Sequence, residues 1–156
     1  MDKNQVLQTL LAQLHEDFKI LKQAALATYE DATHEETKPE NKYDTRALEA
    51  SYLAGAQAQR VSDTSELILF CQNLRIRPQE KVAVGALVTV ETTGKKNYFF
   101  FLPKGGGITI QDGTEQIQVM TPSSPLGKAL LGLSQGDTAE ITMSGQKKVY
   151  EILAVI

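Results

Sequence analysis

The chain lacks the features of a secreted, membrane-spanning or broadly nucleic-acid-binding protein. It has one cysteine, Cys71, which excludes an internal disulfide and fits a reducing cytosol. No apolar run approaches the roughly 18 residues that span a bilayer, and the start MDKNQ lacks the basic and then apolar pattern of a signal peptide. With 16 basic and 19 acidic residues, the chain has no excess of Lys and Arg for a broad nucleic-acid surface. We therefore expect a cytoplasmic globular protein with no membrane partner.

The first half of the chain has the apolar spacing of two helices that pack against each other. Steps of four and three residues separate Leu7, Leu11, Leu14, Phe18, Leu21, Ala25, Thr28 and Ala32. After Pro39 the same steps separate Ala47, Ala50, Ala54, Gln57, Val61, Thr64, Ile68 and Cys71. Such a heptad seam cannot be buried by a lone helix in water. Because the connection between the stripes is short and polar, residues 1–74 are expected to form an antiparallel helical hairpin, a coiled-coil arm.

The second half changes to the period of two that is typical of strands. After Pro78 the predicted strands are VAVGALVTVET, NYFFFLP, GITIQ, EQIQVM, DTAEITMSG and KKVYEILAVI. Turn signals separate them, including TTGKKN around Gly94 and SGQKK around Gly145. The aromatic run Tyr98 to Phe101 could stack nucleic-acid bases, but without interleaved basic residues it indicates a core strand.

One helix is predicted among the strands, at SSPLGKALLGL. Ser123 or Ser124 can cap this helix, and Pro125 falls in its first turn. Residues 79–156 are therefore expected to form a small α+β domain. The junction with the hairpin is expected at residues 73–81, because Pro78 disfavours helix at the residue before it.

Carboxylates are concentrated where the two predicted helices meet. Residues 1–74 carry 12 acidic and 7 basic residues, whereas residues 75–156 carry 7 acidic and 9 basic ones. Six of the acids fall within residues 30–44, namely Glu30, Asp31, Glu35, Glu36, Glu40 and Asp44. A solvated loop is the ordinary interpretation of such a run. The alternative is a site for a hard cation such as Mg²⁺, which commonly takes one or two protein carboxylates and completes its shell from another source.

The layout of an antiparallel coiled coil followed by a small α+β domain resembles the Gre family of bacterial transcript-cleavage factors, GreA and GreB. The segment SSPLGKALLG at 123–132, called the signature below, is similar to the family's SP-helix-G motif. GD at 136–137 follows at the right interval, and YEILAVI closes the chain as the family's last strand does. The resemblance implies that an FKBP-like C-terminal domain docks on core RNA polymerase at the secondary channel. Ser124, Pro125 and Lys128 would then be partner-binding residues of the signature.

The resemblance also implies a role for the acids between the helices. The family's acids help the polymerase hold a second Mg²⁺ and orient the water that cuts backtracked RNA, which is two-metal phosphodiester hydrolysis. Alignment on the dipeptide EN places Glu40 at the second of two functional acids, with Glu36 and Asp44 as candidates for the other. Glu36 and Glu40 would hold the Mg²⁺. The chain would stimulate the polymerase rather than be an enzyme, and would meet nascent RNA and DNA only through the elongation complex.

Other functions remain open at this point. Thr37 stands where the family has its first acid and Pro39 enters the turn, which is compatible with a non-cleaving regulator that occupies the channel. A peptidyl-prolyl isomerase or chaperone is disfavoured, because an FKBP-type proline pocket usually rests on a tryptophan and this chain has none. A purely structural coiled-coil protein is the remaining alternative.

Overall fold

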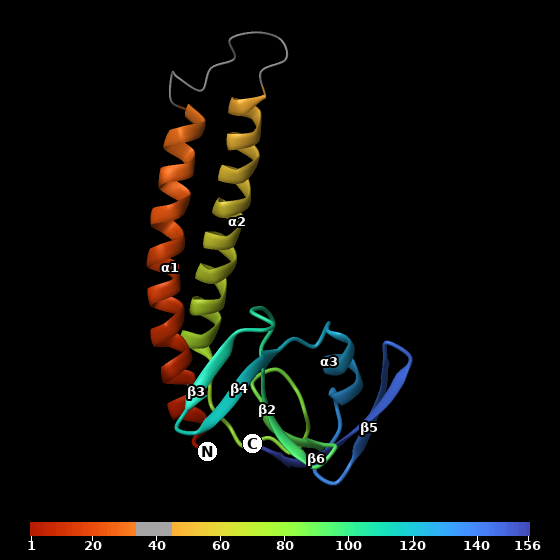
Figure 1. The fold of residues 1–156 in the computed structure, drawn as a ribbon. Helices are drawn as coiled ribbons and strands as arrows, with labels where there is room; N and C mark the ends of the chain where they lie inside the picture. Colours follow the sequence, from red (N-terminus) through yellow and green to blue (C-terminus); the bar gives the residue numbers. More distant parts are fainter. Residues whose placement is uncertain (34–44) are drawn as a thin grey trace. The chain divides into compact units, whose positions relative to one another are not determined.

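The computed structural model describes residues 1–33 and 45–156, in which two long helices come first and strands with one short helix follow (Figure 1). The elements are α1 (Lys3–Thr33), α2 (Arg46–Asn73), β1 (Leu87–Thr92), β2 (Lys95–Phe101), β3 (Thr109–Asp112), β4 (Glu115–Met120), α3 (Pro125–Leu130), β5 (Thr138–Met143) and β6 (Gln146–Val155). The predicted α+β fold is confirmed. Among the described helices, none is long and apolar enough to cross a membrane.

The chain forms two compact units, each with its own packing. The hairpin unit is Leu11–Gln72, and the sheet unit combines Met1–Leu10 with Asn73–Ile156. The sequence expectation divided the chain at residues 74–79 and assigned the first ten residues to the arm. The structure groups these ten residues with the sheet. The sequence could not show this, because a heptad stripe indicates which side of a helix is protected but not which part of the chain protects it.

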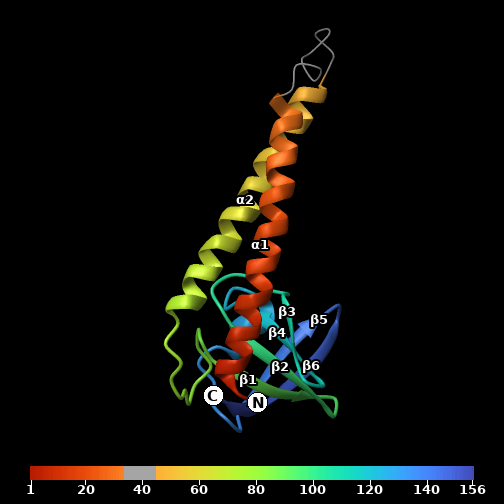
Figure 2. The same ribbon diagram turned by 90° about the vertical axis from the view of Figure 1, so that its left-hand side faces the viewer.

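In the hairpin unit, α1 and α2 lie side by side and run antiparallel (Figure 1 and Figure 2). The predicted seam is the protected side of each helix. Leu14, Ile68 and Cys71 are buried. The other described seam residues of this unit are half-buried, namely Leu11, Phe18, Leu21, Ala25, Thr28, Ala54, Gln57, Val61 and Thr64. Ile20 and Tyr52, which lie off the seam, are exposed. The heptad prediction is therefore confirmed for the residues that the structure describes.

The buried Cys71 thiol should make the protein less stable at alkaline pH. Burial raises the pKa of this thiol from 9.0 to about 11. The unfolded chain therefore releases the proton first, so this contribution to the free energy of unfolding is lost as pH rises from about 9 to about 11. Cys71→Ala should lower stability near neutral pH, because it removes buried atoms, but should reduce the alkaline decline. Urea unfolding of both proteins between about pH 8 and pH 11 measures this difference; parallel profiles would contradict it.

The sheet unit contains one six-stranded sheet in the order β3-β4-β2-β1-β6-β5. Neighbouring strands are antiparallel except β2 and β4, which run parallel. The turns predicted at Gly94 and Gly145 are both present. In each turn the glycine and the residue before it, Thr93 or Ser144, have positive φ, as a two-residue type I′ hairpin requires.

Three of the four aromatic residues in the run of β2 are core, as predicted, whereas Tyr98 is only half-buried. Phe99 and Phe101 belong to a buried cluster that also contains Leu130 of α3 and Tyr150 of β6. Phe100 is fully buried as well and points to the opposite face, because successive side chains of a strand alternate. The same strand therefore supplies buried aromatic rings to both faces of the sheet.

The start of α1 is tied to the sheet unit by two long-range hydrogen bonds. The Lys3 ammonium donates to the Arg77 carbonyl at 3.0 Å, and Gln5 Nε2 donates to Asp112 Oδ1 at 3.2 Å. Burial lowers the pKa of the Lys3 ammonium. A fragment that begins at residue 79 therefore lacks part of its own unit, and docking experiments need the full chain.

Candidate functional site

The signature builds a tight cap at the start of α3. Ser124 is the N-cap, with an extended backbone, and its Oγ accepts a hydrogen bond from the Gly127 amide at 3.0 Å. The Ser124 hydroxyl lies 2.9 Å from the Thr121 carbonyl, to which it donates. Pro125 takes the first helical position, where its missing N–H leaves no intrahelical hydrogen bond unmade. Of the two serines that could cap this helix, Ser124 is therefore the one that does.

Gly127 is present because the chain passes too close for a side chain. A Cβ at this position would lie 2.0 Å from the Thr121 carbonyl oxygen and 2.7 Å from Ser124 Oγ. The fold alone thus explains why the signature has a serine at position 124 and a glycine at position 127.

Other residues of the signature face solvent. Pro125 and Lys128 are exposed, and Leu131, at the end of α3, is 46% exposed. Ser124 is half-buried and Leu130 is fully buried. Of the three predicted partner-binding residues, Pro125 and Lys128 are therefore available to a partner, whereas the Ser124 hydroxyl is engaged within the chain.

A groove of about 510 Å³ opens beside α3. Its lining includes Leu126 of α3 together with Phe99, Met120, Met143 and Tyr150 from four different strands. The sequence interpretation did not identify this groove. Its residues are scattered along the chain, and only the order of the strands in the sheet brings them together. No local sequence pattern predicts that order.

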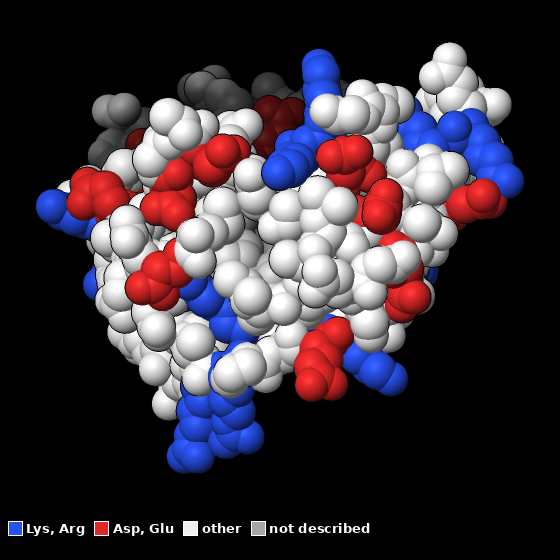
Figure 3. Space-filling model, turned by 90° about the horizontal axis from the view of Figure 1, so that it is seen from below, with Lys and Arg blue, Asp and Glu red and all other residues white. Residues whose placement is uncertain are grey.

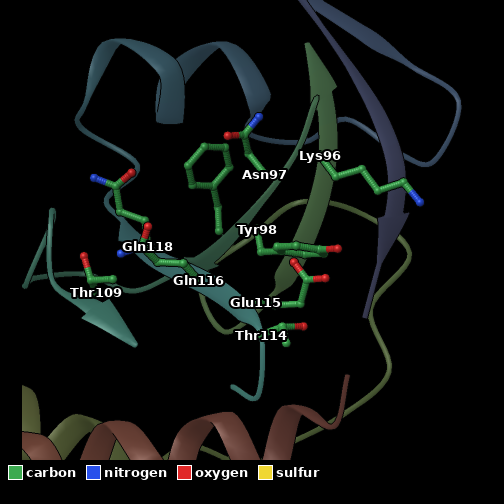
Figure 4. Close-up of a pocket in the computed structure, with 9 residues that line it drawn as sticks. Lys96, Asn97, Tyr98, Thr109, Thr114, Glu115, Gln116 and Gln118 are labelled. Atoms are coloured by element: carbon green, nitrogen blue, oxygen red, sulfur yellow. The ribbon is translucent and has the colours of Figure 1, made fainter. Parts of the chain in front are cut away.

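A second cavity, of about 470 Å³, lies over β2, β3 and β4 (Figure 4). Asn97, Gln116 and Gln118 provide amide groups to it. Tyr98 and Glu115 lie next to each other at one side, and burial together with the Glu115 carboxylate raises the pKa of the Tyr98 phenol. Such a lining suits hydrogen bonding to a polar surface.

The described residues do not include a preformed metal centre. Among them, no group of three or more His, Cys, Asp and Glu side chains could hold a metal ion. The acids predicted for cleavage, Glu36, Glu40 and Asp44, lie in residues 34–44, outside the described ranges. Their roles, including Mg²⁺ binding by Glu36 and Glu40, therefore stay predictions.

Charges are mixed on the face shown in Figure 3. Acidic and basic side chains alternate around an uncharged central area, and the basic ones do not merge into one continuous surface. This face thus lacks the basic stripe that a direct nucleic-acid-binding surface usually shows.

Comparison with known proteins identifies the family. The family model described as "Transcription elongation factor, GreA/GreB, C-term" matches residues 77–156, which include the whole signature. GreA of Sinorhizobium medicae (strain WSM419) is 30% identical over 116 residues, covering 68% of this chain and 69% of that protein. GreA of Rhizobium meliloti (strain 1021) gives the same values. The chain belongs to the GreA/GreB family. It is thus a Gre transcription elongation factor, as the resemblance of its signature indicated.

Solved structures with a similar chain path include two proteins from Thermus. GreA factor homolog 1 (Gfh1) of Thermus thermophilus is 15% identical with a TM-score of 0.39, and the match covers 94% of each chain. Gfh1 of Thermus aquaticus is 22% identical with a TM-score of 0.40, covering 96% of this chain and 90% of that one.

Proposed function

We propose that this Gre-family factor docks on core RNA polymerase through its sheet unit and stimulates cleavage of backtracked RNA with the acids between its two long helices. The match of the family to residues 77–156 carries the proposal. The signature within that range presents Pro125 and Lys128 to solvent. Docking would take place at the rim of the secondary channel, and the hairpin would enter it. Nascent RNA and DNA would be met only through the elongation complex.

The chemistry assigned to the acids is that of a shared metal shell. Mg²⁺ is usually held by one or two carboxylates and keeps other ligands from water, substrate or a partner. Glu40 with Glu36 or Asp44 would supply such carboxylates, and the polymerase would supply the rest. A second metal stabilises the attacking and leaving oxygens of a phosphodiester. The factor would therefore stimulate a reaction that belongs to the polymerase.

A second candidate function is a non-cleaving regulator that docks in the same way. It is favoured by a departure from the family's pattern between the two long helices. Thr37 stands where the family has its first acid, and Pro39 enters the turn. A pull-down with core polymerase, followed by a cleavage assay on a stalled elongation complex, separates the two functions. Binding with cleavage supports the first, binding without cleavage supports the second, and absence of binding contradicts both.

Lys128→Ala tests the docking surface. The side chain is exposed, so its removal should leave the melting temperature unchanged and should weaken polymerase binding by about three- to tenfold, the effect of losing one interfacial charge. Lys95→Ala is the matched control, because Lys95 is also an exposed lysine of the same unit, at the start of β2. Titration of labelled factor with core polymerase measures both affinities. Equal affinities for the two variants would remove Lys128 from the docking surface.

A further inference from the structure

The hydrogen-bonding capacity of Ser124 is used within its own chain. Its Oγ accepts from the Gly127 amide at 3.0 Å and lies 2.9 Å from both the Thr121 carbonyl and the Met120 sulfur. A hydroxyl has one proton to donate, and here it faces acceptors at the end of β4. The side chain therefore joins the last residues of β4 to the first turn of α3.

The backbone of Ser124 makes the same connection. Its amide donates to the Thr121 carbonyl at 3.1 Å, and its carbonyl accepts from the Lys128 amide at 2.8 Å. The exposed Pro125 is its direct neighbour in the chain. The direction in which Pro125 and Lys128 face solvent is thus set by the cap that Ser124 makes.

We propose that Ser124 is a positioning residue for polymerase docking and that Pro125 and Lys128 make the contact. This inference rests on the docking function proposed above. Losing the cap leaves the Gly127 amide without its partner and loosens the first turn of α3. A looser turn must be ordered again when the complex forms, and that ordering costs affinity.

The test compares three full-length proteins with wild type in titrations against core polymerase. Ser124→Ala removes the cap and should weaken binding about fivefold, the ratio that corresponds to a typical N-cap. Ser124→Asn should restore most of the affinity, because asparagine caps as well as serine and its amide can also donate. A serine that contacts the polymerase directly would not be replaced by the longer asparagine.

The double variant Ser124→Ala with Lys128→Ala distinguishes a positioning serine from one that only stabilises the fold. If Ser124 acts through Lys128, the loss caused by Ser124→Ala should shrink in the Lys128→Ala background. Additive losses, or Ser124→Asn as weak as Ser124→Ala, would overturn the inference. If Ser124→Ala fails to fold, the test rests on Ser124→Asn. Binding of Ser124→Asn to core polymerase with wild-type affinity would support the inference, and loss of that affinity would overturn it. Failure of wild type to bind polymerase would instead overturn the proposed function.

Discussion

Gly127→Ala should destabilise the sheet unit by about 1–3 kcal/mol or more, as overpacking of a tight site does. The new Cβ would lie 2.0 Å from the Thr121 carbonyl oxygen, and that oxygen belongs to a backbone held by hydrogen bonds to Ser124. The other close neighbour, Ser124 Oγ at 2.7 Å, is held by its hydrogen bonds to the Thr121 carbonyl and the Gly127 amide. Either the first turn of α3 must shift or the end of β4 must move, so polymerase docking should weaken as well.

Gly55→Ala is the matched control for Gly127→Ala. Gly55 lies inside α2, and a Cβ there would meet nothing within 4 Å. Alanine in a helix interior is favoured over glycine by about 0.5–1 kcal/mol, so this variant should be more stable than wild type. Thermal and urea unfolding, monitored by circular dichroism, compare the two. A Gly127→Ala protein as stable as Gly55→Ala would show that the path around Thr121 adapts at no cost.

Local patterns were enough to predict the elements of this protein. The heptad steps that include Leu14 and Ile68 predicted the protected sides of α1 and α2, because helical periodicity depends only on neighbours along the chain. The turns at Gly94 and Gly145 were equally predictable, since type I′ turns need residues that tolerate positive φ. The serine and proline spacing predicted a cap at Ser123 or Ser124, and the structure shows that Ser124 makes it.

Non-local packing was not predictable in the same way. The parallel pairing of β2 with β4 places the β3–β4 hairpin beside β2, and no turn residue specifies that position. The groove beside α3 depends on the order of the strands in the sheet, so the sequence could not identify Met143 and Tyr150 as lining residues. Thr121 was also missed, because its role is carried by a backbone carbonyl, which has no residue-specific signal in a sequence.

The two parts of the proposed mechanism have different support in the chain. Docking rests on the sheet unit, where the family match and the exposed residues Pro125 and Lys128 coincide. Cleavage rests on residues 34–44, for which the sequence alone supplies the argument. Variants of these acids should therefore separate binding from chemistry.

Glu40→Gln should lower stimulated RNA cleavage by about a hundredfold or more, the scale of losing one preorganised electrostatic group at a reaction centre. The substitution keeps the size of the side chain and removes its charge, so affinity for core polymerase should stay close to wild type. The variant should then compete with the wild-type factor and inhibit cleavage in mixtures. Glu30→Gln is the control, because it removes the same charge from an exposed position of α1, outside the predicted set of functional acids.

Mg²⁺ dependence then decides what each acid does. Glu36→Gln or Asp44→Asn should reduce cleavage for whichever residue is the second acid, and added Mg²⁺ should partly restore the variant whose carboxylate holds the metal rather than the water. Cleavage of a stalled complex over a series of Mg²⁺ concentrations measures this. If wild type binds polymerase but stimulates no cleavage at any concentration, the acids are not catalytic. Thr37 and Pro39 would then account for that result, and the hairpin would act as a plug of the channel.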